Sequence, residues 1–500
     1  MRKLTPKSGI DTMTFKIPIH ANSGPCAKDL RCLAAPKNCL LTLFLALASG
    51  LAAAVTQPCN LTAAEFTSMN GDFSADVHAV RNYESAMAGM LKAEKFEQLD
   101  CLADHARSGK ERLPGGAWKL YLLYGGLWDP VQYPVTHATR EDWNAHLQHL
   151  QSWVTARPQS VTARIALARA YLNYAYDARG EGTAGTVSET GWRLFGQRTA
   201  EAKRILEEAS ALPTKCPEWY FAMLLVAQNQ SWEPEQARAL FDEAFKLEPG
   251  YFYDARILAN YLLPKWSGAE GDTEKFIQEI ADRIAGEQGD IFYFQVAIAP
   301  HLFCGCPGDP HLSMARIERG FEATEKQYGV SMMNLNKVAL AAVRTNPGDP
   351  IFADKVLTRI GEQWDEETWT EKKDFDTAKS FSAFMAKRLT IEIAADTNMQ
   401  TPEGLRYKAS IEKPYKELVQ QCVQPGGGDT GKFKSLIDIG AKGAVEDSRI
   451  YGRSAATHCI YEKLRALQQQ KAIPFPPPPQ APYWVRIDLD WAEFTAVAAN

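Results

Sequence analysis

The densest group of metal-ligating side chains lies in the segment HLFCGCPGDPH, at His301, Cys304, Cys306 and His311. Thiolates and imidazoles are ligands that zinc prefers, and the Gly and Pro residues between them predict a loop. The Cys-x-Cys spacing is tighter than the usual two-residue spacing, and in an oxidising compartment each thiol could form a disulfide elsewhere. A metal site, a disulfide and free thiols all remain open for this cluster. We expect no metal and no other cofactor.

A second group of reactive side chains lies in YDARGEGTAGTVSETGWRLFGQ. Arg179, Glu181, Glu189 and Trp192 combine charge, an aromatic ring and flexible glycines, which predicts a partner-binding surface. Glu181 and Glu189 could act as acid and base if the fold held them about 5 to 9 Å apart, but the spacing does not enforce this. A tolerated surface loop is the alternative. Further along the chain, Trp266 is a fifth candidate for partner contact.

His146 and His149 lie three residues apart on a predicted helix near Asp142, which would allow a shared metal ion. A solvated helix face explains the same pattern. The sequence contains no HExxH, GxSxG, Walker A loop or strand-linked GxGxxG. We therefore expect no catalytic residues. The rival hypothesis is an envelope hydrolase or metal-dependent enzyme that uses residues 179–192 or the cluster from His301 to His311.

The composition is that of an ordinary globular protein. Of 500 residues, 45% are hydrophobic and 23% are charged, so there is ample chain for a large core. A formal net charge of −5 provides no basic surface for phosphates, which excludes nucleic acid as an expected partner.

Residues 40–54, LLTLFLALASGLAAA, predict export. This uncharged apolar run follows Lys28, Arg31 and Lys37, and its Ala52 and Ala54 supply the small-x-small pattern of a signal-peptide cleavage site. We expect cleavage after Ala54 and a periplasmic or secreted mature protein. The alternative is an inner-membrane anchor formed by residues 39–55, although the run is short for a bilayer core of about 30 Å.

The middle of the chain contains helix pairs with the spacing of tetratricopeptide (TPR) repeats. In EQARALFDEAFKLEPG, Ala237 and Ala244 would let two helices approach, Phe241 would fill the groove, and Pro249 would end the unit. Residues 218–229 predict its first helix. A second pair is split by an insertion at residues 172–197, and a weaker third pair spans 253–263 and 273–281. The second pair carries its repeat residues at Leu167, Ala168, Tyr171, Ala202, Leu206 and Ala209.

The last hundred residues predict a different fold. A helix from Pro402 to Cys422 precedes two short strands, a helix from Ala455 to Gln470 and a final alternating strand in WVRIDLDW. In the first strand, Phe433, Ser435, Ile437 and Ile439 should share one face. Cys422 ends the entering helix and Cys459 lies on the apolar face of the next one, which predicts a disulfide between them.

Several segments between residues 95 and 380 resemble an exported proteobacterial TPR-like family of unknown function. The likeness rests on KFEQLDCLADHARSGKERLPGGAWKLYLLYGGL, DARGEGTAGTVSETGW, CPEWY and YLLPKWSGAEGD, with LLPKWSG the most specific part. The resemblance implies a TPR-like fold and export, but no mechanism.

The C-terminal β-β-α-β order, the strand-Gly-strand at Ile439 to Val445 and the Pro-rich FPPPPQAP resemble the C-terminal domain of TonB-type proteins. In that family an edge strand pairs with a short segment of an outer-membrane partner. A cleaved signal would depart from the retained anchor of that family, so the resemblance implies peptide binding and not energy transduction.

Together these patterns predict a mainly α protein, a TPR-like helical-repeat solenoid with a small C-terminal α+β domain. The expected organisation is an N-terminal extension and signal peptide at 1–54, a helical domain at 55–400 and a TonB-like domain at 401–500. The expected function is a non-enzymatic interaction scaffold that binds a protein or peptide of the cell envelope. Membrane contact is expected only if the signal segment is retained.

Overall fold

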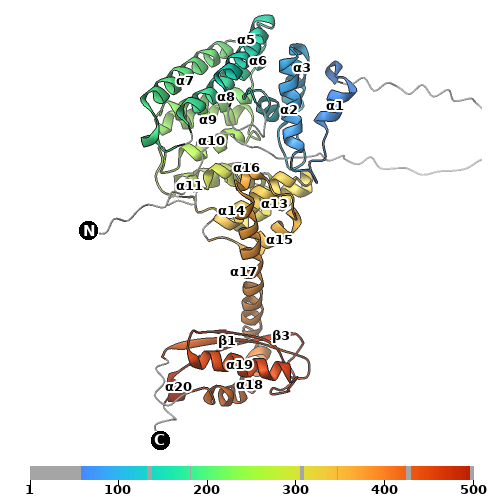
Figure 1. Cartoon of the computed structure of the whole chain (residues 1–500), viewed down its shortest axis with the longest axis vertical. Coiled ribbons are helices and arrows are strands. Elements are labelled where there is room, and N and C mark those ends of the chain that lie inside the picture. The colour runs from blue at the N-terminus through green and yellow to red at the C-terminus, as the bar shows by residue number, and fades with distance from the viewer. Residues whose placement is uncertain are drawn as a thin grey trace, which may run out of the picture. The chain divides into compact units, whose positions relative to one another are not determined.

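The computed structural model describes residues 58–131, 138–180, 182–303, 309–345, 347–423 and 430–495 (Figure 1). The fold is mainly helical, with a three-stranded antiparallel sheet near the C-terminus. The chain divides into two compact units, one through Lys379 and one from Ser380 onward. The signal peptide, its cleavage site and the alternative anchor at 39–55 lie outside the described residues. Within the described ranges, no helix has the length and apolarity needed to span a membrane.

The first unit consists of helices of 4 to 22 residues and the first part of α17. Its helices are α1 (Ala63–Met69), α2 (Ala79–Lys92), α3 (Phe96–Ser108), α4 (Lys119–Gly125), α5 (Arg140–Ala156), α6 (Val161–Arg179), α7 (Glu189–Ser210), α8 (Pro217–Asn229), α9 (Pro234–Leu247), α10 (Tyr253–Tyr261), α11 (Asp272–Ile284), α12 (Gly286–Ala297), α13 (Met314–Tyr328), α14 (Met332–Arg344), α15 (Pro350–Ile360), α16 (Glu366–Trp369) and α17 (Lys372–Met399).

Many of these helices begin at a residue whose side chain caps the first turn. Ser160, Ser188, Ser331 and Asp349 each accept a hydrogen bond from the backbone N–H three residues later, at the starts of α6, α7, α14 and α15. Thr139 forms a reciprocal capping box at the start of α5. These caps satisfy N–H groups that have no partner inside a helix, so the helix starts are encoded locally.

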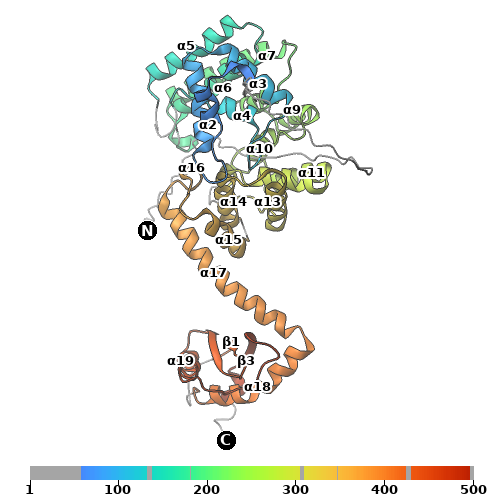
Figure 2. The ribbon, with the colours of Figure 1, turned by 90° about the vertical axis from the view of Figure 1, so that its right-hand side faces the viewer.

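Consecutive helices pack in pairs. α6 packs on α7, α8 on α9, α10 on α11, α12 on α13 and α14 on α15. The first helices of successive pairs also touch, α6 with α8, α8 with α10 and α10 with α12. Both ribbon views show α13, α14 and α15 side by side (Figures 1 and 2). One continuous hydrophobic core therefore runs through the unit.

Most of the predicted repeat residues are buried. Ala237, Phe241 and Ala244 are at most 1% exposed, and the Phe241 ring meets the ring edge of Phe276 from α11 at 5.0 Å between centroids. Pro249 follows the end of α9 and is exposed. In the second pair all six positions are helical, and Tyr171 is the one that is only half-buried.

The insertion at 172–197 is mostly helical. α6 continues to Arg179 and α7 begins at Glu189, so the connection between the two helices is far shorter than the predicted insertion at 172–197. The added residues lengthen both helices, which pack on each other along this extension. Gly180 ends α6 with φ of 73°, a backbone conformation that glycine adopts without strain.

The inner faces of several first helices are covered by the chain's own residues 113–128, which we call the inner segment. Its helix α4 is buried, with Leu120 through Tyr124 at 0% exposure. The Gly115 carbonyl accepts hydrogen bonds from Gln295 of α12 at 3.2 Å and Asn334 of α14 at 2.7 Å. A Cβ at Gly115 would lie 2.1 Å from that of Ser331, so only glycine fits this approach.

The second unit contains the later part of α17, α18 (Pro402–Gln420), β1 (Lys432–Ile439), β2 (Val445–Tyr451), α19 (Ala455–Gln469), β3 (Tyr483–Asp490) and α20 (Ala492–Thr495). The sheet order is β2-β1-β3 and both pairings are antiparallel. β1 is therefore central, and β2 and β3 are the edges.

Alternation along β1 gives the sheet two covered faces. Phe433, Ile437 and Ile439 join one core with α18 and α19, and the Ser435 hydroxyl on the same face bonds the Tyr415 hydroxyl of α18 at 2.5 Å. On the other face, Leu436 packs on Ile391 and Ala395 of α17. A disulfide joins Cys422, just after α18, to Cys459 in α19.

Candidate functional site

The predicted partner-binding residues fall into two groups, one at the insertion and one at Trp266. The Arg179 guanidinium lies 5.6 Å from the Trp192 ring and donates to the carbonyls of Gly180 and Gly182. Trp192 is 41% exposed and Glu189 is exposed in the same first turn of α7, so these three side chains share one surface. Glu181 lies outside the described residues, and with it the proposed pair of carboxylates.

Trp266 lies elsewhere, in the turn after α10, where it is half-buried and packs against the core of the unit. A hydrogen bond within this turn holds Trp266 there, because its backbone N–H donates to the Leu263 carbonyl at 2.9 Å. No contact joins it to the Arg179 surface among the residues that the structure describes.

The cysteines of the predicted His/Cys cluster, Cys304 and Cys306, lie outside the described residues. His301 Nε2 faces the Arg256 backbone carbonyl at 3.3 Å, and burial lowers the pKa of His301 to about 3. His311 is exposed, and its backbone N–H donates to Glu274 of α11. The two histidines thus have separate surroundings.

The histidines of α5 also have separate environments. His146 is 5% exposed, its Nε2 bonds the Leu127 carbonyl at 2.8 Å, and burial lowers its pKa to about 4. His149 is half-buried, and its Nδ1 lies 3.6 Å from a Glu94 carboxylate oxygen. The expectation of one solvated face is therefore wrong for His146, which is a core residue because the inner segment ends against it.

Among the described ranges, the one group of His, Cys, Asp and Glu ligand atoms close enough for a metal ion is Cys59, Cys101 and His105. Cys59 and Cys101 form a disulfide, so their sulfur atoms are not available as thiolates. Cys216 is a buried free thiol whose pKa burial raises, which keeps it protonated.

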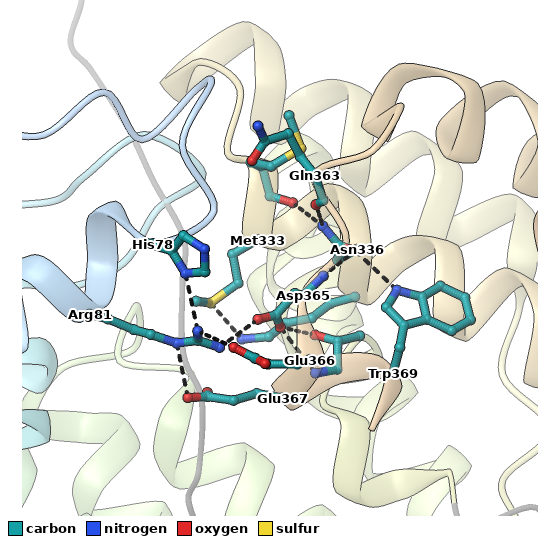
Figure 3. A network of polar contacts seen from close by, with 12 residues as sticks. His78, Arg81, Met333, Asn336, Gln363, Asp365, Glu366, Glu367 and Trp369 are labelled. Atoms are coloured by element: carbon teal, nitrogen blue, oxygen red, sulfur yellow. Dashed lines mark hydrogen bonds and ion pairs between the residues drawn. The ribbon is translucent and has the colours of Figure 1, made fainter. Parts of the chain in front are cut away.

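A cluster of charged side chains that sequence reasoning missed ties α2 to the end of the first unit (Figure 3). The Arg81 guanidinium meets Asp365 at 3.0 Å, Glu366 at 2.9 Å and Glu367 at 3.2 Å. Asp365 is the N-cap of α16 and accepts from the Thr368 N–H, so its carboxylate is held from two sides. We call these residues the Arg81 cluster.

Asn336 of α14 supports the Arg81 cluster from the other side (Figure 3). Its side-chain oxygen accepts from the Asp365 N–H and from Trp369 Nε1, both at 3.0 Å. Its side-chain nitrogen donates to the carbonyls of Met332 and Gln363. Because all of these groups are satisfied, the position of α16 is fixed against α14.

Two ionisable groups next to the Arg81 cluster have shifted pKa values. Burial lowers the pKa of Lys337 to about 7, and its Nζ contacts Met333 Sδ at 3.2 Å. Loss of hydration raises the pKa of Glu84 to about 8, and the nearby Glu367 adds to the shift. Both groups therefore change charge close to neutral pH, which is a property of residues that exchange protons or respond to pH.

A row of buried polar groups continues from this cluster along the first helices. Arg169 of α6 pairs with Glu218 of α8, and its guanidinium lies 4.3 Å from the rings of Trp128 and Phe221. Arg256 of α10 donates to the Gln295 carbonyl of α12 at 2.7 Å. Arg169 thus contacts the inner segment through Trp128, whereas Arg256 joins α10 to α12.

The outer edge of β3 presents backbone groups to solvent. Even-numbered residues of the strand point their N–H and C=O away from β1, since Asn398 Nδ2 donates to the Trp484 carbonyl and the Asp490 N–H donates to Glu493. Between these two bonds, no described residue bonds the backbone N–H or C=O of Arg486 or Asp488. Four hydrogen-bonding groups in the middle of this edge therefore have no partner in the described part of the chain.

No family model, curated protein or solved structure matches the chain.

Proposed function

We propose that the protein is an exported, non-enzymatic interaction scaffold that binds an extended peptide segment of a cell-envelope protein along β3. The observation that carries this proposal is the pair of unpaired backbone positions, Arg486 and Asp488, on an edge strand. Proteins usually cover or blunt such an edge, and an uncovered one accepts a further strand.

The edge at β2 is less suited to the same role. α19 packs along β2, and Gln468 of that helix donates to the Glu446 carbonyl. At β3, by contrast, Asn398 and Glu493 occupy only the two ends of the edge. The resemblance to TonB-type C-terminal domains points to the same mode of binding, and we propose that the second unit belongs with them.

We also propose that the helix pairs of the first unit are TPR-like repeats of the exported proteobacterial family that the sequence resembles. The contacts of α6 with α8, α8 with α10 and α10 with α12, together with the buried Ala237, Phe241 and Ala244, support this assignment. The first unit would then carry the peptide-binding unit and supply further contacts, for which the Arg179 and Trp192 surface is a candidate.

The test uses one substitution that removes only an outward N–H. In Asp488→Pro, the ring replaces that N–H on an edge strand, where proline is tolerated, while the bonds to β1 are kept. Asp488→Asn is the matched control, because it removes the charge and keeps the N–H. Peptides selected by phage display against the full mature chain should bind the wild type and Asp488→Asn, and bind Asp488→Pro at least about tenfold more weakly.

Hydrogen exchange locates the contact. Bound peptide should slow exchange at Arg486 and Asp488, because their N–H groups then donate to the added strand. If the selected peptides bind Asp488→Pro as tightly as the wild type, or protect no amide of β3, the proposed binding edge is wrong. Export is tested separately: the mature protein in a periplasmic extract should begin near Val55.

A further inference from the structure

A cavity of about 230 Å³ lies in the first unit, between Arg112, which precedes the inner segment, and helices α10 to α13. Its apolar wall is formed by Phe252, Ile284, Ile291 and Phe292. Phe252, Ile291 and Phe292 are at most 7% exposed, whereas Pro249 and Gln288, which also line the cavity, are exposed. The cavity therefore has a mouth at the surface and an apolar floor.

One cation lines this cavity without an ion pair. Arg112 stacks its guanidinium on the Trp118 ring, at 3.5 Å between Cζ and the ring centroid. Its Nε is buried and has no hydrogen-bond partner among the described residues. A guanidinium whose Nε is buried without a hydrogen-bond partner has lost part of its hydration, which makes the cavity attractive to a negatively charged group.

A carboxylate near Arg112, that of Glu248, is already engaged. Glu248 pairs with Lys110 at 2.6 Å and accepts from the Gly250 N–H. Gly250 also leaves room for the guanidinium, because a Cβ there would lie 3.2 Å from an Arg112 terminal nitrogen. The loop before α10 thus allows Arg112 to lie against the cavity, and its carboxylate, Glu248, forms its ion pair with Lys110.

Tyr328 adds a hydroxyl to the wall of the cavity, and burial raises its pKa, so the hydroxyl stays protonated and can donate a hydrogen bond. The remaining polar lining groups are amides, at Gln288 and Gln295. No carboxylate lines the cavity among the residues that the structure describes. The cavity thus offers one positive charge, neutral hydrogen-bond donors and apolar walls. A ligand with one negative charge on an apolar body fits this lining.

We propose that this cavity binds a small monocarboxylic acid with an apolar body, its carboxylate on the Arg112 guanidinium and its body against Phe252, Ile291 and Phe292. Arginine binds carboxylates through paired, charge-assisted hydrogen bonds, and the apolar walls reward burial of the rest of the ligand. The volume is below the roughly 300 to 1,000 Å³ of cavities for drug-sized ligands, which limits the body to about one aromatic or branched aliphatic group.

Two sources share this chemistry, a free carboxylic acid and the C-terminal residue of a peptide. The test titrates the full mature chain by calorimetry with 3-phenylpropanoate, 4-methylpentanoate and a tetrapeptide that ends in phenylalanine with a free carboxylate. The uncharged controls are 3-phenylpropanol and the same tetrapeptide with an amidated C-terminus. We expect at least one carboxylate to bind, and its uncharged control to bind at least tenfold more weakly. Tighter binding of the acid or of the peptide then identifies the source.

Two variants test the site in different ways. Arg112→Gln removes the charge, and Ile284→Trp fills the mouth while it leaves the charge in place. Each should weaken carboxylate binding at least tenfold, whereas the surface control Arg204→Gln on α7 should not change it. Because Ile284 is only half-buried, that variant tests the site even if Arg112→Gln does not fold.

The proposal is overturned if none of the three carboxylates binds the wild type, if charged and uncharged ligands bind alike, or if folded Ile284→Trp binds as tightly as the wild type. These outcomes do not depend on β3, which belongs to the other unit.

Discussion

Arg81→Met should destabilise the first unit by about 3 kcal/mol. Two of the three acidic partners of Arg81, Glu366 and Glu367, have side chains that are 34% and 22% exposed, and ion pairs with such partners contribute at most about 1 kcal/mol each. Asp365 is different, because its side chain is fully buried. Removal of the partner of a buried charge typically costs about 3 to 5 kcal/mol. The cap bond from Thr368 keeps Asp365 partly satisfied, which places the effect at the lower end.

The assay is urea unfolding followed by hydrogen exchange, because exchange assigns the lost stability to a unit. Exchange should accelerate in α2 and α16 and stay unchanged in β1. Arg157→Met is the matched control, since the Arg157 side chain is 46% exposed in its pair with Asp100 and its loss should cost less than about 1 kcal/mol.

A double variant separates the buried charge from lost packing. Asp365→Asn removes the charge that Arg81→Met leaves unpaired and keeps an oxygen for the α16 cap, so the double variant should be more stable than Arg81→Met alone. If Arg81→Met costs no more than Arg157→Met, or if the second substitution gives no recovery, the Arg81 cluster does not hold α2 to α16.

Three further changes test other parts of the structure. Phe241→Ala should cost about 3 to 5 kcal/mol, because it opens a cavity against α11, and hydrogen exchange should accelerate in the neighbouring helices but not in β1. Serine at both Cys422 and Cys459 should destabilise the second unit by about 2 to 5 kcal/mol in thermal unfolding, and an unchanged midpoint would contradict this. Glu84→Gln should stabilise the protein at pH 9 and not at pH 5. Folding raises the pKa of the Glu84 carboxyl from 4.5 to about 8. The neutral form therefore contributes fully to stability below pH 4.5, and this contribution is lost as the pH rises through 8. Urea denaturation of both proteins at pH 5 and pH 9 checks this.

Local patterns account for the elements that the sequence predicted well. Small and large apolar residues at helical spacing predicted α8 and α9, and strict alternation in WVRIDLDW predicted β3. Each of these signals depends on residues within one element. The expected link between Cys422 and Cys459 needed only the packing of two neighbouring helices, and the two sulfur atoms are bonded.

The Arg81 cluster could not be predicted in the same way. Arg81 and Asp365 are 284 positions apart, and a charged residue in a sequence ordinarily indicates a solvated surface. Asp365 does precede α16 at a position typical of an N-cap, but that pattern explains a helix start and not a distant partner. The glycines of the insertion indicated flexible backbone, but Gly191 and Gly196 lie inside α7. Helix packing there overrides their low helix propensity.

The inner segment changes where a partner can bind the first unit. Tyr121 stacks on Tyr253 at 4.1 Å and packs edge-on against Phe221, so α4 covers the inner faces of α8 and α10. The bonds from Gln295 and Asn334 to the Gly115 carbonyl do the same for α12 and α14. A partner that required these faces would have to displace a fully buried helix. We therefore propose that the first unit binds on its outer surface and at the Arg112 cavity, where Arg112 lies just before the inner segment and its Nε has no hydrogen-bond partner among the described residues.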